Sequence, residues 1–111
     1  MKQPDRHILE KILDEISFLE NLLLGVDDSA FLNDETIKRA AAMASINIGE
    51  LAKHLSDDFY QAYPGSELKY AARTRDVYAH GYYTLHFETV YKTATEDYPR
   101  VKSWILEHID D

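Results

Sequence analysis

Apolar side chains recur every three or four residues in two long stretches, and this spacing restricts both stretches to amphipathic helices. The first stretch covers residues 5–24. The second begins at a cap formed by Asn33 or Asp34 and extends to about Leu55, so residues 26–33 are predicted to be a connecting loop. The two apolar stripes consist of Ile8, Ile12, Ile16, Leu19 and Leu23 in the first helix and Ile37, Ala41, Ala44, Ile48, Leu51 and Leu55 in the second.

A short helical turn and a third helix are predicted in the middle of the chain. Ser56 is expected to cap the turn, which Pro64 and Gly65 end, and Ser66 is expected to cap the third helix. This helix is predicted to end near His80. Gly49, inside the second helix, costs about 1 kcal/mol relative to alanine, which suggests close packing against another helix or a tolerated imperfection.

A last helical region is predicted over about residues 85–110, with Thr84 as its cap. Pro99 lacks a backbone donor, which predicts a kink or a restart near Asp97. The sequence shows neither the alternation of a strand nor an internal repeat. Residues 1–111 are therefore predicted to form a single all-α domain, an up-and-down bundle of four to five helices.

Composition restricts the class of protein. The chain has 111 residues and no cysteine, which excludes disulfides, zinc–thiolate sites and a cysteine nucleophile. The sequence contains no apolar run long enough to cross a membrane, so we expect a cytoplasmic protein without a membrane partner. The net charge of −8 argues against a broad nucleic-acid footprint. From residue 69 to 82, however, three cations face one acid, and such a patch can still bind phosphate.

An arginine, an acid, a histidine and a tyrosine occur within eight residues, in the segment Arg75-Asp76-Val77-Tyr78-Ala79-His80-Gly81-Tyr82. Arginine binds phosphate through a fixed fork of donors, and histidine can transfer a proton near neutral pH. Gly81 suits the end of a helix, which places His80 on the last turn. Together with a ribose 2′-hydroxyl, Arg75 and His80 would suffice to cleave RNA without a metal.

Arg75 and His80 are five residues apart, which is about 500° of helical rotation and leaves them about 140° apart in projection. The two side chains converge only at a helix terminus or when a second copy completes the site. This spacing therefore favours a site at the interface of a homodimer. An arginine and a histidine on an amphipathic helix are nevertheless more often a surface charge and a capping residue.

Other polar residues have weaker claims to a functional role. Asn47 and Glu50 flank an apolar position of the second helix, and they lie either on the solvent face or beside the site. The five histidines lack the spacing of a metal-binding pair, so no metal site and no cofactor are predicted.

The segment Arg75-Asp76-x-x-x-His80-x-Tyr82 resembles the signature of the HEPN superfamily, and the tyrosine after the histidine resembles its HepT branch. The segments 46–52 and 96–102 are also similar to that branch, so the resemblance spans about residues 8–109. Two departures are Asp76, where asparagine is common, and Thr84, which lies where an acidic cap is usual.

The resemblance implies an all-α homodimer and a metal-independent ribonuclease toxin of a type VII toxin–antitoxin system. Arg75 and His80 would be catalytic, with Asp76 and Tyr82 in support. The partners would be RNA and an MntA-like nucleotidyltransferase antitoxin, which silences the toxin by transferring AMP to Tyr82 and can join it in a larger hetero-oligomer. The alternatives are a non-catalytic HEPN subunit that binds or regulates a nucleotidyltransferase, and a structural dimerisation bundle.

Overall fold

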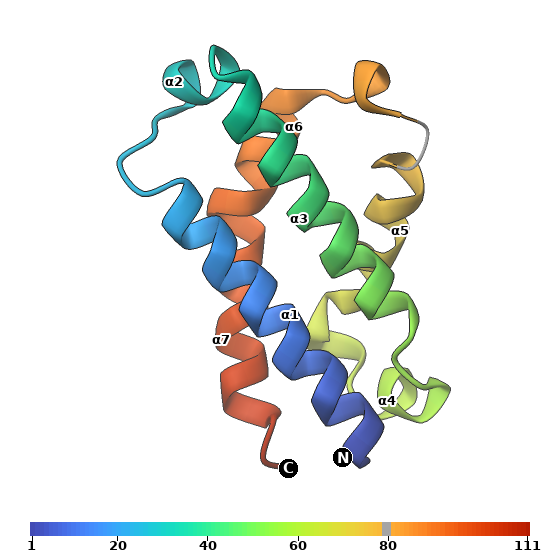
Figure 1. Cartoon of the computed structure of the whole chain (residues 1–111). Helices are drawn as coiled ribbons and strands as arrows, with labels where there is room; N and C mark the ends of the chain where they lie inside the picture. The colour runs from blue at the N-terminus through green and yellow to red at the C-terminus, as the bar shows by residue number, and fades with distance from the viewer. Residues whose placement is uncertain (79–80) are drawn as a thin grey trace.

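The computed structural model describes residues 1–78 and 81–111, and all regular structure within these ranges is helical (Figure 1). The elements are α1 (Gln3–Leu22), α2 (Asp28–Leu32), α3 (Glu35–Lys53), α4 (Asp57–Ala62), the 3₁₀ turn η1 (Pro64–Ser66), α5 (Leu68–Tyr78), the 3₁₀ turn η2 (Tyr82–Thr84), α6 (Phe87–Lys92), the π-helical turn η3 (Thr93–Asp97) and α7 (Tyr98–His108). The predicted all-α class is confirmed.

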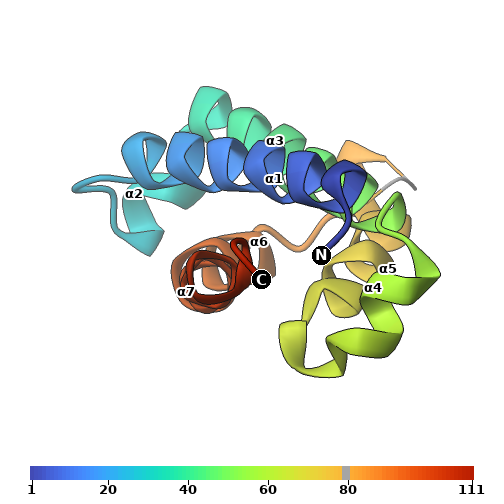
Figure 2. The ribbon, with the colours of Figure 1, turned by 90° about the horizontal axis from the view of Figure 1, so that it is seen from below.

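The long elements alternate in direction, as an up-and-down bundle requires. In Figure 1, α1 rises from the N-terminus, α3 descends beside it, α5 rises, and the path from α6 to α7 descends to the C-terminus. Figure 2 shows α1 and α3 as one layer, with α5 and α7 both on the same side of it. The two termini meet, since the Met1 ammonium donates to the Asp111 carbonyl at 2.9 Å.

The core lies between these two layers and is built from the predicted stripes. Ile12, Ile16 and Leu19 of α1 are buried. At the N-terminal end of the stripe, Leu9 is buried, whereas Ile8, which was expected there, is only partly buried. Small residues of α3 allow the neighbouring helices to approach, and α5 and α7 close the core. The other buried apolar residues of these helices are Ala41, Ala42, Ala44, Ile48 and Ala52 on α3, Leu68, Ala71 and Tyr78 on α5, and Tyr98, Val101 and Ile105 on α7.

Side-chain caps start α3 and α4 where the sequence predicted them. The Asp34 carboxylate accepts a hydrogen bond from the Ile37 amide at 3.0 Å, and the Ser56 hydroxyl accepts one from the Phe59 amide at 3.1 Å. Each cap satisfies one of the amides that the first turn of a helix leaves without a partner.

Two boundary predictions are wrong. The predicted loop 26–33 contains α2, which Asp27 caps by accepting from the Ala30 amide at 2.8 Å. Thr84 does not cap the last helical region, because its hydroxyl donates to the Gly81 carbonyl and α6 begins later, after His86. The predicted last helical region over about residues 85–110 is confirmed as the consecutive elements α6, η3 and α7, and the restart predicted near Asp97 is the start of α7 at Tyr98.

Candidate functional site

Arg75 lies where α5 packs against the C-terminal half of α3, and Gly49 permits this contact. A Cβ atom at Gly49 would lie 2.3 Å from the Arg75 Cβ and 2.8 Å from the Ala71 carbonyl oxygen. Any side chain at this position would therefore push α5 away from α3. The prediction of close packing at Gly49 is confirmed.

The Arg75 guanidinium is fixed by acids from two helices. Its Nε lies 2.7 Å from Oε2 of Glu50 on α3, and its Nη1 lies 3.4 Å from Oδ1 of Asp76, its neighbour on α5. The Arg75 side chain is 30% exposed, so part of it remains open to solvent. Among the residues that the structure describes, Nη2 has no partner, which leaves two N–H donors for a ligand such as a phosphate.

Asp76 also binds a second cation. Its Oδ1 accepts from Lys53 Nζ of α3 at 3.1 Å. This hydrogen bond, with a smaller contribution from Arg75, holds the pKa of the Asp76 carboxyl below its usual value, so the group is ionised at neutral pH. Glu50, Lys53, Arg75 and Asp76 therefore form a chain of two cations and two anions, which we call the Arg75 cluster.

The structure separates the two flanking residues of α3 that the sequence left undecided. Glu50 faces the site through its ion pair with Arg75. Asn47 turns toward α1 instead, where its amide donates to Glu15 at 3.1 Å.

Tyr82 lies in η2, against the N-terminal turn of α3. Its hydroxyl donates a hydrogen bond to the Glu35 carboxylate, and its ring lies under the Arg39 guanidinium at 4.2 Å. Glu35 raises the pKa of Tyr82, while Tyr82 and then Lys38 lower the pKa of Glu35. The points where α3 contacts Tyr82 and Arg75 are about 22 Å apart along the helix axis, so a single chain does not bring these two residues together.

The predicted catalytic His80 lies outside the described residues, together with Ala79. The helix that carries Arg75 is described to Tyr78, and the chain resumes at Gly81 with φ of 117°. This backbone conformation favours glycine, as the position after the motif histidine was predicted to need. The Gly81 amide donates to the Tyr78 carbonyl at 3.3 Å, so η2 follows closely on the end of α5.

Comparison with known proteins places the chain in a family. The model of the family described as "Ribonuclease HepT-like" matches residues 12–107. The chain belongs to the HepT-like ribonuclease family. It is 30% identical to a probable ribonuclease HepT of Thermococcus cleftensis, over 92% of this chain and 93% of that protein. A protein of Methanocaldococcus jannaschii named as a candidate RNase is 29% identical, over 97% of this chain and 96% of the relative. No solved structure matches significantly.

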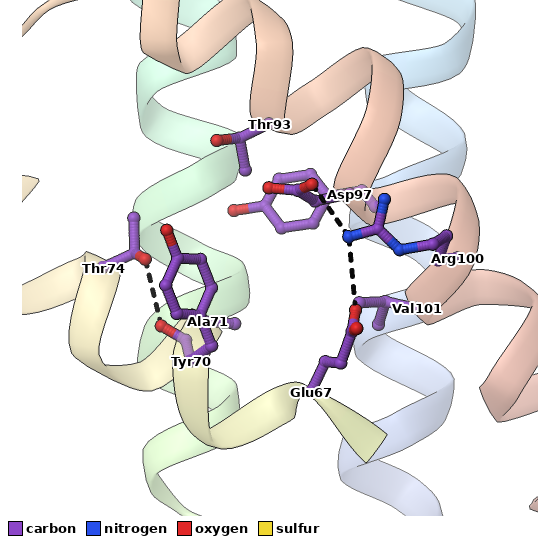
Figure 3. A pocket seen from close by; sticks show the side chains of 9 residues that line it. Glu67, Tyr70, Ala71, Thr74, Thr93, Asp97, Arg100 and Val101 are labelled. Carbon is purple, nitrogen blue, oxygen red and sulfur yellow. Dashed lines mark hydrogen bonds and ion pairs between the residues drawn. The ribbon is translucent and has the colours of Figure 1, made fainter. Parts of the chain in front are cut away.

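This HepT-like chain also has a pocket away from the predicted site residues. The pocket measures about 380 Å³ and lies between α5 and the path from η3 to α7. Figure 3 shows Arg100 at its edge, joined to Asp97 at 3.0 Å and to Glu67 at 3.5 Å, with Tyr70 on the α5 side. Arg75 does not line it, so this hollow on the other face of α5 does not contain the Arg75 cluster.

The described part of the HepT-like chain lacks two further features. No group of three or more histidine, aspartate or glutamate side chains there is arranged to hold a metal ion. None of the helices in residues 1–78 and 81–111 is both long and apolar enough to span a membrane.

Sequence reasoning missed three residues that organise these sites. Lys53 supports Asp76, while Glu35 and Arg39 hold Tyr82. All three contacts join residues at least 23 positions apart, so no local spacing could have revealed them. A weak signal for Lys53 exists, because it lies one helical turn after Glu50 on the face that α5 covers.

Proposed function

We propose that this chain is a metal-independent endoribonuclease toxin that cleaves RNA through the ribose 2′-hydroxyl. The observation that carries the proposal is the Arg75 guanidinium, which pairs with Glu50 and Asp76 while the side chain stays partly exposed. An arginine held in this way can bind the non-bridging oxygens of a phosphate without losing further side-chain entropy. Membership of the HepT-like family supports the same reaction.

In the proposed reaction, the 2′-oxygen attacks the neighbouring phosphorus, and the bond from phosphorus to the 5′-oxygen breaks. A neutral His80 accepts the 2′-hydroxyl proton, and a protonated His80 donates a proton to the leaving 5′-oxygen. Arg75 stabilises the charge that builds on the phosphate. The products are a 2′,3′-cyclic phosphate and a 5′-hydroxyl, so neither a metal nor a cofactor is needed.

Two copies of the chain would supply the two histidines that this reaction uses. A homodimer is therefore part of the proposal, with the cleft formed where the α5 ends of the two copies meet. Size-exclusion chromatography with light scattering tests the dimer directly.

We further propose that a nucleotidyltransferase antitoxin silences the enzyme by transferring AMP to the Tyr82 hydroxyl, and that the two proteins assemble. Tyr82 lies in an exposed turn that a partner can reach. We expect a mass increase of one or more AMP units after reaction with ATP and the partner. Tyr82→Phe should remove this increase and the control Tyr83→Phe should keep it. If Tyr82→Phe still gained AMP, the modified hydroxyl would belong to another residue.

One observation favours a second candidate function. Glu50 already neutralises Arg75, and an arginine in an ion pair can serve structure alone. Under this alternative, the chain is a non-catalytic subunit that binds or regulates the nucleotidyltransferase.

Arginine substitutions on α5 separate the two candidates. Arg75→Ala should lower the rate of RNA cleavage by about 10²–10³-fold, the usual cost of losing one group that stabilises transition-state charge. Arg73→Ala is the matched control, because Arg73 is an exposed arginine of the same helix outside the Arg75 cluster. If wild type and Arg75→Ala cleave RNA equally, or if both arrest growth equally, the enzymatic proposal fails and the regulatory subunit is favoured.

A further inference from the structure

Tyr83 presents its ring to solvent at the surface of η2. Its exposed fraction of 92% is the highest among the large apolar side chains that the structure describes. Exposing an aromatic ring has a hydrophobic cost and makes no contribution to the core. A ring held in the open in this way suggests a contact with another molecule.

The turn that carries Tyr83 is well supported. The Thr84 hydroxyl donates to the Gly81 carbonyl at 2.8 Å, and the Thr84 amide donates to the same oxygen at 3.2 Å. The Tyr82 ring packs against Phe87 at 5.1 Å and meets the Tyr83 ring edge-on at 5.3 Å. The exposure of Tyr83 therefore results from a turn that its own hydrogen bonds fix and that rests on the half-buried ring of Phe87.

Two cations from α3 lie beside these rings. The Arg39 guanidinium stacks on Tyr82 at 4.2 Å and is 58% exposed, while Lys38 lies 4.8 Å from the Phe87 ring centre and is largely covered. Glu35 binds both cations, at 3.0 Å to Lys38 and 3.5 Å to Arg39, so these three charges sum to one positive charge. In a protein of net charge −8, this surface is a local attraction for phosphate.

We propose that Tyr83, Tyr82, Arg39 and Lys38 form a binding site for single-stranded RNA, which we call the η2 patch. One base stacks on Tyr83, and Arg39 contacts an adjacent phosphate. Exposed aromatic rings next to cations are how proteins hold single strands without reading their sequence. The inference rests on the proposed ribonuclease function, because it assigns the η2 patch to the same substrate.

The η2 patch lies about 22 Å along α3 from the Arg75 cluster, so it contacts a part of the strand several nucleotides from the cleaved phosphate. A nucleotide attached to Tyr82 would occupy the patch and place negative charge beside Arg39. Modification of Tyr82 would then interfere with RNA binding even though Tyr82 is remote from Arg75 within one chain.

Binding of a fluorescent 2′-O-methyl RNA oligonucleotide, measured by anisotropy, tests the η2 patch without cleavage, because the blocked 2′-oxygen cannot attack. Tyr83→Ala should weaken binding roughly 5- to 100-fold, as expected for the loss of one stacked base. Tyr83→Trp should restore it. Tyr70→Ala is the matched control, since Tyr70 is a 61% exposed tyrosine on α5, and it should bind as wild type does. Arg39→Gln should reduce the slope of log K against log salt by about 0.7.

Unchanged binding by Tyr83→Ala would overturn the inference, as would an equal loss in Tyr70→Ala or no RNA binding by the wild-type protein. Cleavage of unmodified RNA, measured in parallel, separates this result from the ribonuclease proposal. If the wild-type protein cleaves RNA but its RNA binding does not depend on Tyr83, the η2 patch proposal fails and the ribonuclease proposal stands. If RNA binding depends on Tyr83 but the wild-type protein does not cleave RNA, the η2 patch proposal stands and the ribonuclease proposal fails.

Discussion

Substitution of Gly49 by alanine tests how the contact between α3 and α5 holds Arg75. In most helix interiors this change stabilises the protein by about 1 kcal/mol, because alanine is the better helix former. Here the new Cβ would lie 2.3 Å from the Arg75 Cβ and 2.8 Å from a backbone oxygen of Ala71. Neither atom is the end of a flexible side chain, so α5 must move away by about 1 Å to reach ordinary contact.

The expected magnitude follows from two opposing terms. Overpacking a tight contact costs about 1–3 kcal/mol, and the better helix propensity of alanine recovers up to about 1 kcal/mol. With the full gain recovered, we therefore expect Gly49→Ala to lower the free energy of unfolding by about 1 kcal/mol, the middle of a range of about 0–2 kcal/mol. At about 4–8 °C per kcal/mol for a small domain, Tm should fall clearly. Since Arg75 carries the clash, RNA cleavage should fall as well.

Urea unfolding followed by circular dichroism measures the change in stability, with Gly65→Ala as the matched control. A Cβ at Gly65 would meet no atom within 4 Å, and its φ does not require glycine, so this variant should be as stable as wild type or slightly more so. If Gly49→Ala proved as stable as Gly65→Ala, the close approach of the two helices would not be what the geometry indicates.

Three further substitutions probe other polar contacts. Asp5 is buried, and its carboxylate accepts hydrogen bonds from the Ser56 amide at 2.9 Å and the Ser56 hydroxyl at 2.6 Å. Asp5→Ala should therefore lower the free energy of unfolding in urea by about 1.5–3 kcal/mol. Asp57 is exposed, so the control Asp57→Ala should change it little. Burial raises the pKa of Tyr60 to about 12 from an ordinary 10.0, so its hydroxyl stabilises the fold below pH 10 and this contribution is lost as the pH rises to 12. Tyr60→Phe should therefore flatten the fall in unfolding free energy between pH 10 and pH 12. An equally steep fall in Tyr60→Phe would contradict this linkage. The pKa of Asp76 is lowered from 3.8, chiefly by the hydrogen bond from Lys53. Wild type should therefore have a higher Tm than Asp76→Asn at pH 7, and this advantage should shrink as the pH falls below 3.8. A Tm difference that stays constant over this pH range would refute the linkage.

The sequence predicted α1, α3 and α4 because the apolar stripes of α1 and α3 and the side-chain caps of α3 and α4 are local signals. The hydrogen bonds of Asp34 and Ser56 to amides three residues later need no information from the rest of the fold. Segment 28–32 was missed because its burial depends on distant partners. Phe31 packs 5.2 Å from Tyr91 and 6.4 Å from Phe87, and no spacing within the segment encodes these contacts.

The last helical region shows the limit of periodicity more clearly. Pro99 has no amide to donate to the turn before it, which predicted a disturbance near residue 97. The sequence could not show that the disturbance takes the form of a π-helical turn over Thr93–Asp97, with Thr93 buried against the bundle. The wider turn depends on how α6 and α7 pack together, which is a property of the whole fold.

The candidate site divides in the same way. The motif identified Arg75 and Asp76, and the structure joins them. The sequence left two positions open for Glu50, on the solvent face or beside the site. It could not decide between them, because Glu50 of α3 reaches Arg75 of α5 only if the two helices approach each other at that level. The separation of Tyr82 from Arg75 was not predictable, because spacing along the chain does not show that η2 follows α3 back toward its N-terminus.

The most direct measurement is cleavage of single-stranded RNA in the presence of EDTA by wild type and by His80→Ala, with the product ends identified by mass spectrometry. We expect wild type to cleave, to leave 2′,3′-cyclic phosphate ends, and to lose this activity in His80→Ala. Equal cleavage by the two proteins, or wild-type cleavage that EDTA abolishes, would contradict a metal-independent ribonuclease that uses Arg75 and His80.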